Sequence, residues 1–260
     1  MSLYLDFGRR QPVATYACFK ANGVSGVARY LDGHRVLHKG LTREEAEDIS
    51  AAGLRIHTVF ETSGGADIDG FPQNGDYFTR EQGGRDWIEA VVDARAAGQP
   101  EGFPIFLAVD LHMPSWTWVG SDNPRLRAYF AGATQQDRVI GGSGYFIGCY
   151  GPDYVCAFIR DTFGITHLWP WLPRPPARPD FAYDLWQYEN GASICGVGVD
   201  RNDCQLDGWR IEEASMDQYV TKAELEAFIA DNRATLEAMK AVETKAIEAL
   251  RAIRDALKDI

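Results

Sequence analysis

The sequence has little positive charge and no long apolar run, and each shortage excludes a class of function. Its 260 residues carry 26 Lys and Arg against 37 Asp and Glu, which gives a formal net charge of −11. Phosphate backbones and anionic lipid surfaces are bound by clustered basic side chains, so we expect no nucleic-acid partner and no membrane partner. No segment approaches the roughly 20 apolar residues of a membrane span. The amino terminus enters a strand-like segment at once, so we expect no signal peptide, and the localisation stays open.

Metal and cofactor motifs are also missing. The five cysteines lack the spacing of a zinc site; they are Cys18, Cys149, Cys156, Cys195 and Cys204. Cys195 and Cys204 would close a short loop in an oxidising compartment, and free buried thiols are the alternative. No His-Glu-x-x-His motif occurs, and residues 7–11 do not form a Gly-rich phosphate loop. We therefore expect no metal and no cofactor.

The most informative segment that is present is the apolar run 105–109, which ends in a carboxylate at Asp110. Its length and composition are typical of a parallel strand that is buried on both faces. In folds built from such strands, the chemistry lies at the carboxyl ends. An acid at this position is costly to bury without a function, so we take Asp110 as the centre of a candidate site.

Strand-like and helix-like segments alternate along most of the chain. We predict eight strands, at residues 3–7, 24–31, 54–61, 104–110, 144–150, 167–172, 183–188 and 192–199. We predict helices at residues 12–22, 42–53, 79–98, 123–136 and 153–163. Thr42 with Glu45 forms a capping box, Thr79 with Gln82 gives a second capping signal, and Asn123 precedes a proline at the first helical position. The pattern predicts an α/β fold, a closed (β/α)8 TIM-type barrel, with an open doubly wound sheet as the alternative.

The pattern changes near the carboxyl terminus. From residue 221 to residue 260, apolar residues recur at alternating spacings of four and three, as in a coiled-coil seam. We predict a barrel domain over residues 1–208 and a long C-terminal helical extension over residues 209–260. The extension either forms a homo-oligomer through residues 221–260 or packs back on the barrel as a single long helix.

Several predicted strands end in acids, and these would meet at one mouth of a barrel. We select Asp6, Glu61, Asp110 and Asp200 as candidate catalytic residues. Candidate substrate-binding residues are aromatic or polar side chains near the same ends, namely Tyr30, His112, Tyr150, Trp186, Gln187 and Trp116. Clustered carboxylates with aromatic neighbours favour glycosidic chemistry, in which one carboxyl protonates the leaving oxygen and another attacks or stabilises positive charge. Trp118, Trp169 and Trp171 are further residues that would line a sugar groove.

The sequence resembles the glycoside-hydrolase-like domain of unknown function 1906, a relative of the family-25 (Chalaropsis-type) lysozymes. The segments that carry the resemblance span about residues 3–203; they are residues 27–31, 40–42 with 45–46, 53–54, 104–110, 146–151, 185–188 and 199–202. The resemblance implies a TIM-type barrel and a polysaccharide substrate, the glycan strands of peptidoglycan. It also matches Asp6 to the acid of the first strand and Asp200 with Asn202 to a late Asp-x-Asn motif.

The chain departs from the lysozymes at the fourth strand. There the lysozymes have Asp-x-Glu, with the Glu as proton donor, and this chain has Ala108, Val109 and Asp110. The donor position therefore holds a shorter acid and its partner carboxylate is absent. Glu61 is the additional acid that would replace that partner.

Two functions follow from these patterns. The first is a glycosidase, a lysozyme-like muramidase, with Asp110 as general acid and Glu61 as the second carboxylate. The second is a catalytically inactive carbohydrate-binding or structural module, for example of a phage particle, that is oligomerised by its C-terminal helix. A phage lysin would act outside the cytoplasm. His112 as a metal ligand and Cys149 as a nucleophile with His112 as its base are weaker alternatives.

Overall fold

The computed structural model describes residues 2–31, 40–61, 76–110, 119–171 and 179–211. The chain divides into two units, Met1–Tyr219 and Val220–Ile260, and the second lies entirely outside the described residues. The predicted helical extension, its coiled-coil seam and its oligomerisation therefore remain predictions. No helix in the described ranges is long and apolar enough to cross a membrane.

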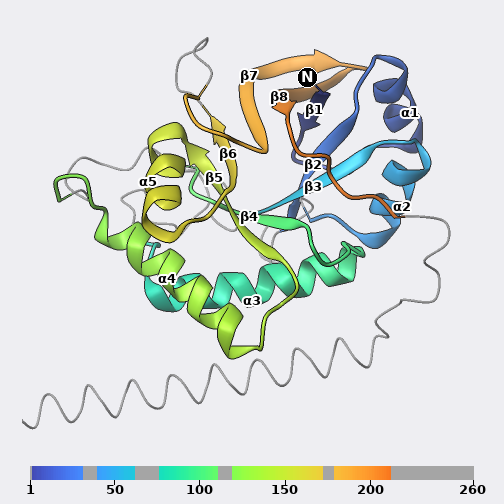
Figure 1. Ribbon diagram of the computed structural model, residues 1–260. Helices are drawn as coiled ribbons and strands as arrows, with labels where there is room; N and C mark the ends of the chain where they lie inside the picture. The colour runs from blue at the N-terminus through green and yellow to red at the C-terminus, as the bar shows by residue number, and fades with distance from the viewer. Residues whose placement is uncertain (1, 32–39, 62–75, 111–118, 172–178, 212–260) are drawn as a thin grey trace, which may run out of the picture. The chain divides into compact units, whose positions relative to one another are not determined.

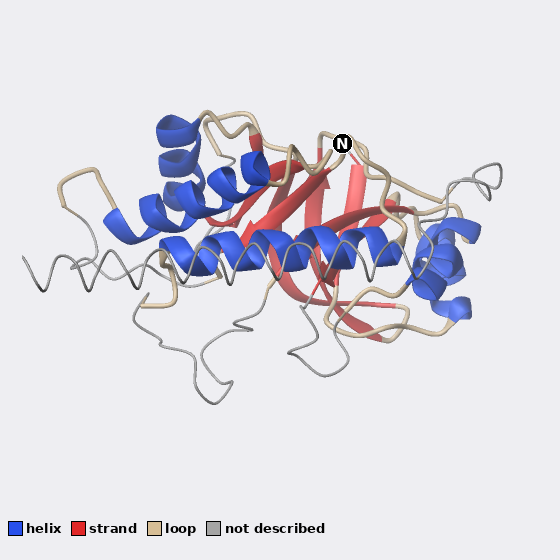
Figure 2. Cartoon of the chain, turned by 90° about the horizontal axis from the view of Figure 1, so that it is seen from below, coloured by secondary structure: helices blue, strands red, loops and turns tan. Residues whose placement is uncertain are grey.

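The described residues form a closed barrel of eight strands with five helices outside it (Figures 1 and 2). The strands are β1 (Ser2–Asp6), β2 (Gly26–Leu31), β3 (Arg55–Phe60), β4 (Pro104–Ala108), β5 (Phe146–Pro152), β6 (His167–Trp171), β7 (Leu185–Ile194) and β8 (Val197–Cys204). The helices are α1 (Val13–Ala21), α2 (Arg43–Ala51), α3 (Arg80–Ala97), α4 (Pro124–Val139) and α5 (Asp153–Phe163). The prediction of a closed eight-stranded barrel is thus confirmed, and the predicted open sheet is excluded.

The predicted helix caps are largely confirmed. The side chains of Thr42, Thr79 and Asn123 accept hydrogen bonds from the backbone N–H groups three residues later, as N-caps do. Half of the predicted capping box is wrong, however. The Glu45 carboxylate does not return to Thr42, because it is fully buried and accepts hydrogen bonds from Arg29 and Tyr16.

The barrel is not the all-parallel (β/α)8 arrangement that we predicted. Strands β1 to β7 pair in parallel, but β8 is antiparallel to both β7 and β1. The cause is a tight hairpin in which Cys195 and Gly196 link β7 to β8 with φ values of 54° and 77°. Two successive residues with positive φ are the signature of a two-residue hairpin turn. The predicted strand at residues 192–199 is wrong because it runs across this turn.

The cysteine pairing also differs from the prediction. Cys195, at the hairpin turn, forms a disulfide with Cys18 on α1. Cys204 is a free, buried thiol at the other end of β8. An extended strand of this length separates its ends by about 25 Å, so Cys195 and Cys204 cannot reach each other.

Candidate active site

The inner face of the barrel is identified by its apolar core. Tyr4, Ala28, Val59, Phe106 and Trp169 belong to one buried cluster that draws residues from neighbouring strands. Side chains alternate between the two faces of a strand, so residues two positions away from these share the inner face. Stepping by two along the strands gives Asp6, Tyr30, Glu61, Asp110, Tyr150, Gln187 and Asp200.

Backbone pairing continues past the ends of β3 and β4, and this keeps two of the acids in register. The Glu61 N–H donates to Leu31 O at 3.1 Å, and the Val109 N–H donates to Tyr150 O at 2.7 Å. Glu61 and Asp110 therefore follow directly from the carboxyl ends of parallel strands. Glu61 is buried, whereas Asp110 is partly exposed.

Asp200 reaches the same mouth by a different route from the one expected. We predicted that it ends a parallel strand, but it lies in the first half of β8. Because β8 is antiparallel to β1, its first half lies beside the carboxyl end of β1, and Asp200 pairs directly with Asp6. The reversed strand therefore brings the two acids side by side.

The surroundings of Asp6 favour its neutral, protonated form. Burial raises its pKa to about 7, and the charges of Asp200, Asp110 and Glu61 act in the same direction. A hydrogen bond from Asn202 Nδ2 to Asp6 Oδ2, at 2.7 Å, opposes them. Within the described residues no Lys or Arg forms an ion pair with Asp6 or Asp200. Asp6 is therefore poised to exchange a proton near neutral pH.

Asp200 is held by donors from the hairpin. Gln187 Nε2 donates to Asp200 Oδ2 at 2.9 Å, and the Gly191 N–H donates to Oδ1 at 2.6 Å. The Tyr150 hydroxyl in turn donates to Gln187 Oε1 at 2.9 Å. Both oxygens of the Asp200 carboxylate are therefore held in place by hydrogen bonds. These contacts connect β5, β7 and β8 across the mouth.

Two tyrosines complete the inner surface of the mouth. Burial raises the pKa of both Tyr30 and Tyr150, and the charges of Asp6, Glu61 and Asp110 raise them further. The acids that act on the two hydroxyls come from β1 and from the ends of β3 and β4. Both phenols remain protonated and can donate hydrogen bonds.

Two other residues selected from the sequence point away from the inner face, and three more lie outside the described residues. Trp186 is on the face of β7 opposite Gln187, where its ring packs against Tyr183 and Tyr188. Cys149, the alternative nucleophile, is on the outer face of β5 and fully buried. His112, Trp116 and Trp118 lie outside the described residues. No group of three or more His, Cys, Asp or Glu in the described ranges has the arrangement to hold a metal ion.

Comparison with known proteins assigns the family. The sequence profile of the Rv2525c-like, glycoside hydrolase-like domain matches residues 17–232, most of the chain. The chain belongs to this family. The resemblance inferred from the sequence motifs is thereby confirmed.

Other relatives of this glycoside hydrolase-like domain are much longer proteins. The chain is 29% identical over 140 residues to YbfG and 31% identical over 143 residues to FadG, both of Bacillus subtilis. These matches cover 52% and 54% of the chain but only 18% and 23% of the relatives. The chain therefore spans about a fifth of the length of the curated relatives it matches.

Solved structures with the same fold include lysozymes. The Tat-secreted protein Rv2525c of Mycobacterium tuberculosis aligns with a TM-score of 0.60 at 22% identity, over 78% of this chain and 95% of its own. The autolysin LytC of Streptococcus pneumoniae gives 0.51 at 12% identity, over 77% and 46%. The lysozyme of Streptomyces coelicolor gives 0.50 at 14% identity, over 78% and 92%. At these identities the likeness supports the fold alone.

Neither Asn202 nor Trp169 was selected as a catalytic candidate, although the two form a hydrogen-bonded chain that ends at Asp6. Asn202 contacts Asp6, and Trp169 Nε1 donates to Asn202 Oδ1 at 2.7 Å. Trp169, which we expected in a sugar groove, is instead 1% exposed inside the barrel. The resemblance had matched Asn202, with Asp200, to the late Asp-x-Asn motif, and strand alternation places Asn202 on the same face as that acid.

Proposed function

We propose that this domain hydrolyses the glycosidic bonds of peptidoglycan glycan strands. In this mechanism Asp110 is the general acid and Glu61 is the second carboxylate, which attacks the sugar or activates water. Asp6 and Asp200 adjust the proton affinities of the cluster and hold the substrate. The observation that carries the proposal is the convergence of these four acids, from four strands far apart in sequence, at one mouth of the barrel.

The chemistry of such a cluster suits an acid–base mechanism. Carboxylates that lie close together in a site with little water cannot all ionise, so the cluster retains a proton near neutral pH. Burial first, and the charges of the neighbouring acids second, raise the pKa of Asp6 to about 7, in line with this effect. A retained proton is what the departing sugar oxygen requires, while the remaining negative charge stabilises the oxocarbenium-like transition state.

Substrate contacts would come from the other inward-facing residues. Tyr30 and Tyr150 offer aromatic surface and hydroxyl donors, and the Gln187 amide is already oriented by Tyr150. His112 and Trp116 remain proposed substrate contacts outside the described residues. Trp186 would contribute only indirectly, by holding β7 in place from its outer face.

The proposed substrate and compartment follow what is known of two proteins that share the fold. LytC has been solved in complex with a synthetic peptidoglycan ligand, and Rv2525c is Tat-secreted. The Cys18–Cys195 disulfide independently favours an oxidising compartment. We infer that the domain acts outside the cytoplasm on the cell wall.

The decisive experiment measures reducing ends released from purified cell walls. The wild-type domain should release them, and Asp110→Asn should abolish the release because the amide cannot donate the proton. Asp161→Asn is the matched control, since Asp161 is an exposed acid on α5 that pairs with Arg160, and it should leave the rate unchanged. Binding of glycan fragments without any release by the wild type would overturn the proposal and favour an inactive binding module.

The stereochemistry of the product assigns the role of Glu61. Retention of the anomeric configuration requires a covalent intermediate on a carboxylate, whereas inversion requires a carboxylate that activates water. Proton NMR of the first product formed distinguishes the two. If Glu61→Gln cleaves as fast as the wild type, Glu61 is not the second carboxylate.

A further inference from the structure

Asp6 receives one hydrogen bond from a described side chain, and its donor is the amide of Asn202. Asn202 Nδ2 lies 2.7 Å from Asp6 Oδ2, and Asn202 is fully buried on β8. A donor at this position favours the charged form of the carboxyl. The orientation of this one amide therefore acts directly on the proton of Asp6.

An asparagine amide can present either its oxygen or its nitrogen to a neighbour, so its orientation needs a cause. Trp169 supplies the cause, because its indole N–H lies 2.7 Å from Asn202 Oδ1 and can only donate. It therefore binds the oxygen of the amide and directs Nδ2 toward Asp6. The indole is itself held in place by an edge contact with Phe106 and a tilted contact with Tyr150, with ring centroids 5.7 Å and 4.7 Å away.

We propose that Trp169 and Asn202 are a positioning pair that keeps an N–H donor on Asp6 and thereby sets the pH at which this acid of the cluster releases its proton. Asn202 contacts Asp6, Trp169 contacts Asn202, and the pair acts on the reaction only through Asp6. Its mechanistic meaning rests on the proposed glycosidase function, but its effect on Asp6 does not.

The pair acts against the other groups that face Asp6. The charged or titratable neighbours come from five elements, namely Asp200 on β8, Asp110 after β4, Glu61 after β3, Tyr30 on β2 and Tyr150 on β5. The three acids all favour a neutral Asp6, as does burial. If Asn202 turned its oxygen toward Asp6, the carboxyl would keep its proton well above neutral pH, because only the neutral form can then donate.

The test is a carboxyl ¹³C NMR titration of the full chain labelled at aspartate, in which Asp6→Asn assigns the Asp6 signal. Trp169→Phe removes the indole donor, and Asn202→Leu removes the amide. Each should raise the midpoint of Asp6 by about one pH unit or more. Phe106→Leu is the matched control, since it loosens the packing around Trp169 without removing the N–H, and it should leave the midpoint unchanged.

The unmodified chain gives a second test that needs no variant to fold. The side-chain amide of Asn202 and the indole N–H of Trp169 should both shift with pH at the same midpoint as the Asp6 carboxyl. Resonances that do not move with Asp6, or an unchanged Asp6 midpoint in folded Trp169→Phe, would contradict the proposed role of the pair. These readouts need no substrate, so failure to cleave cell walls would reject the proposed function and leave the pair standing.

Activity adds a third readout where cleavage is observed. In Trp169→Phe the limb of the kcat/KM profile that reports Asp6 should move by the same interval as the NMR midpoint, while KM stays constant. A loss of activity that is uniform across pH would show a merely structural role for Trp169.

Discussion

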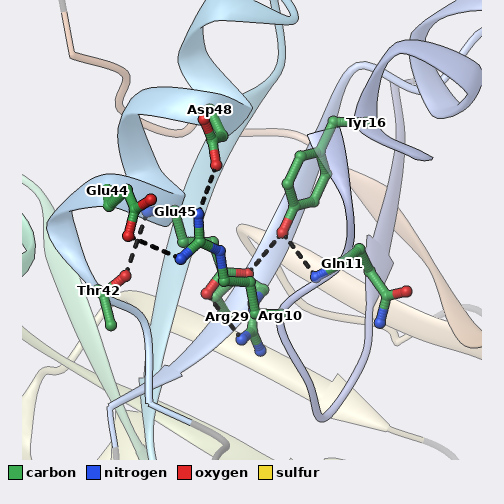
Figure 3. A network of polar contacts seen from close by, with 8 residues as sticks. All are labelled: Arg10, Gln11, Tyr16, Arg29, Thr42, Glu44, Glu45 and Asp48. Atoms are coloured by element: carbon green, nitrogen blue, oxygen red, sulfur yellow. Dashed lines mark hydrogen bonds and ion pairs between the residues drawn. The ribbon is translucent and has the colours of Figure 1, made fainter. Parts of the chain in front are cut away.

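Two carboxyls of this chain are both buried and yet have opposite surroundings. Asp6, at the mouth of the barrel, faces three other acids and one amide donor. Glu45, on the outer flank, is fully buried but accepts hydrogen bonds from the Arg29 guanidinium and the Tyr16 hydroxyl (Figure 3). Burial alone therefore does not mark a functional acid. What distinguishes the two regions is whether the surroundings compensate the charge or oppose it.

The outer flank is organised so that its charge is satisfied. Arg29 lies on the outer side of β2, contacts both oxygens of Glu45 and also donates to Phe7 O at 2.7 Å. Tyr16 brings α1 to the same carboxylate, and Glu45 itself belongs to α2. The network thus joins α1, α2, β2 and Phe7, the residue that follows Asp6 and β1, and its role is to hold these segments together.

The comparison is tested most strongly by removing the charge of Glu45. Glu45→Gln should lower the free energy of unfolding by about 3–5 kcal/mol, because it takes away the carboxylate paired with a buried guanidinium. Urea unfolding followed by circular dichroism measures the loss. Glu44→Gln is the control, since Glu44 pairs with Arg10 at the exposed surface and its removal should have little effect. Equal stabilities for the two variants would contradict the contrast between the regions.

The second largest effect on stability is expected from removal of the disulfide. Cys18–Cys195 holds the turn of the β7–β8 hairpin, and that hairpin carries Gln187, Gly191 and Asp200. The double variant Cys18→Ser, Cys195→Ser should lose about 2–4 kcal/mol of unfolding free energy. It should also weaken activity, because the donors to Asp200 become less ordered.

Reduction of the wild type provides the control for this prediction. Dithiothreitol should destabilise the wild type to the level of the double serine variant and leave that variant unaffected. Cys149, Cys156 and Cys204 are buried thiols, so the reductant has no other described disulfide to act on. If dithiothreitol also destabilises the double variant, the loss of stability does not come from reduction of the Cys18–Cys195 disulfide.

Removing the charge of Asp6 at the mouth should have the opposite effect on stability from removing the charge of Glu45 on the outer flank. The pKa of Asp6 is about 7 in the folded chain, against an ordinary value of 3.8. Between these values the folded state binds more protons than the unfolded state, so the free energy of unfolding falls as pH rises and the loss is complete above pH 7. Asp6→Asn removes this penalty and keeps an acceptor for Asn202.

Asp6→Asn should therefore be more stable than the wild type at pH 8 by about 1 kcal/mol or more, and the difference should vanish near pH 4. Thermal unfolding at several pH values measures this trend. The same variant should lose activity, as expected where function requires an unfavourable charge cluster. If Asp6→Asn is destabilising at every pH, Asp6 resembles Glu45 and the distinction between the regions fails.

The sequence predicted those parts of the fold that depend on local chemistry. The caps at Thr42, Thr79 and Asn123 and the end of α5 at Phe163 follow from side-chain hydrogen bonds and backbone preferences within a few residues. The convergence of strand-end acids followed from the expectation of a closed barrel. These predictions needed no knowledge of distant contacts.

The features of the structure that the sequence did not predict depend on pairing between distant segments. Cys195 with Gly196 is a weak turn signal by itself, and only the antiparallel pairing of β8 shows that it reverses the chain. Glu45 has the spacing of a capping box, but Arg29 and Tyr16 compete successfully for its carboxylate. The selection of Asp200 rested on the wrong strand direction, and its place beside Asp6 comes from the register of β8 with β1.

The smallest effect on stability is expected from a change that weakens the outer flank without altering its charged groups. The Thr42 hydroxyl accepts the Glu45 N–H at 3.2 Å and caps the helix that carries Glu45. Thr42→Ala should lower the free energy of unfolding by about 1 kcal/mol, whereas Thr42→Ser should keep most of it. Neither variant should move the Asp6 midpoint or change the rate of wall cleavage, because the cap holds α2 and not the mouth. A shift of the Asp6 midpoint in Thr42→Ala would mean that the flank acts on the proton of the acid cluster, so that the two regions would have to be treated as one site.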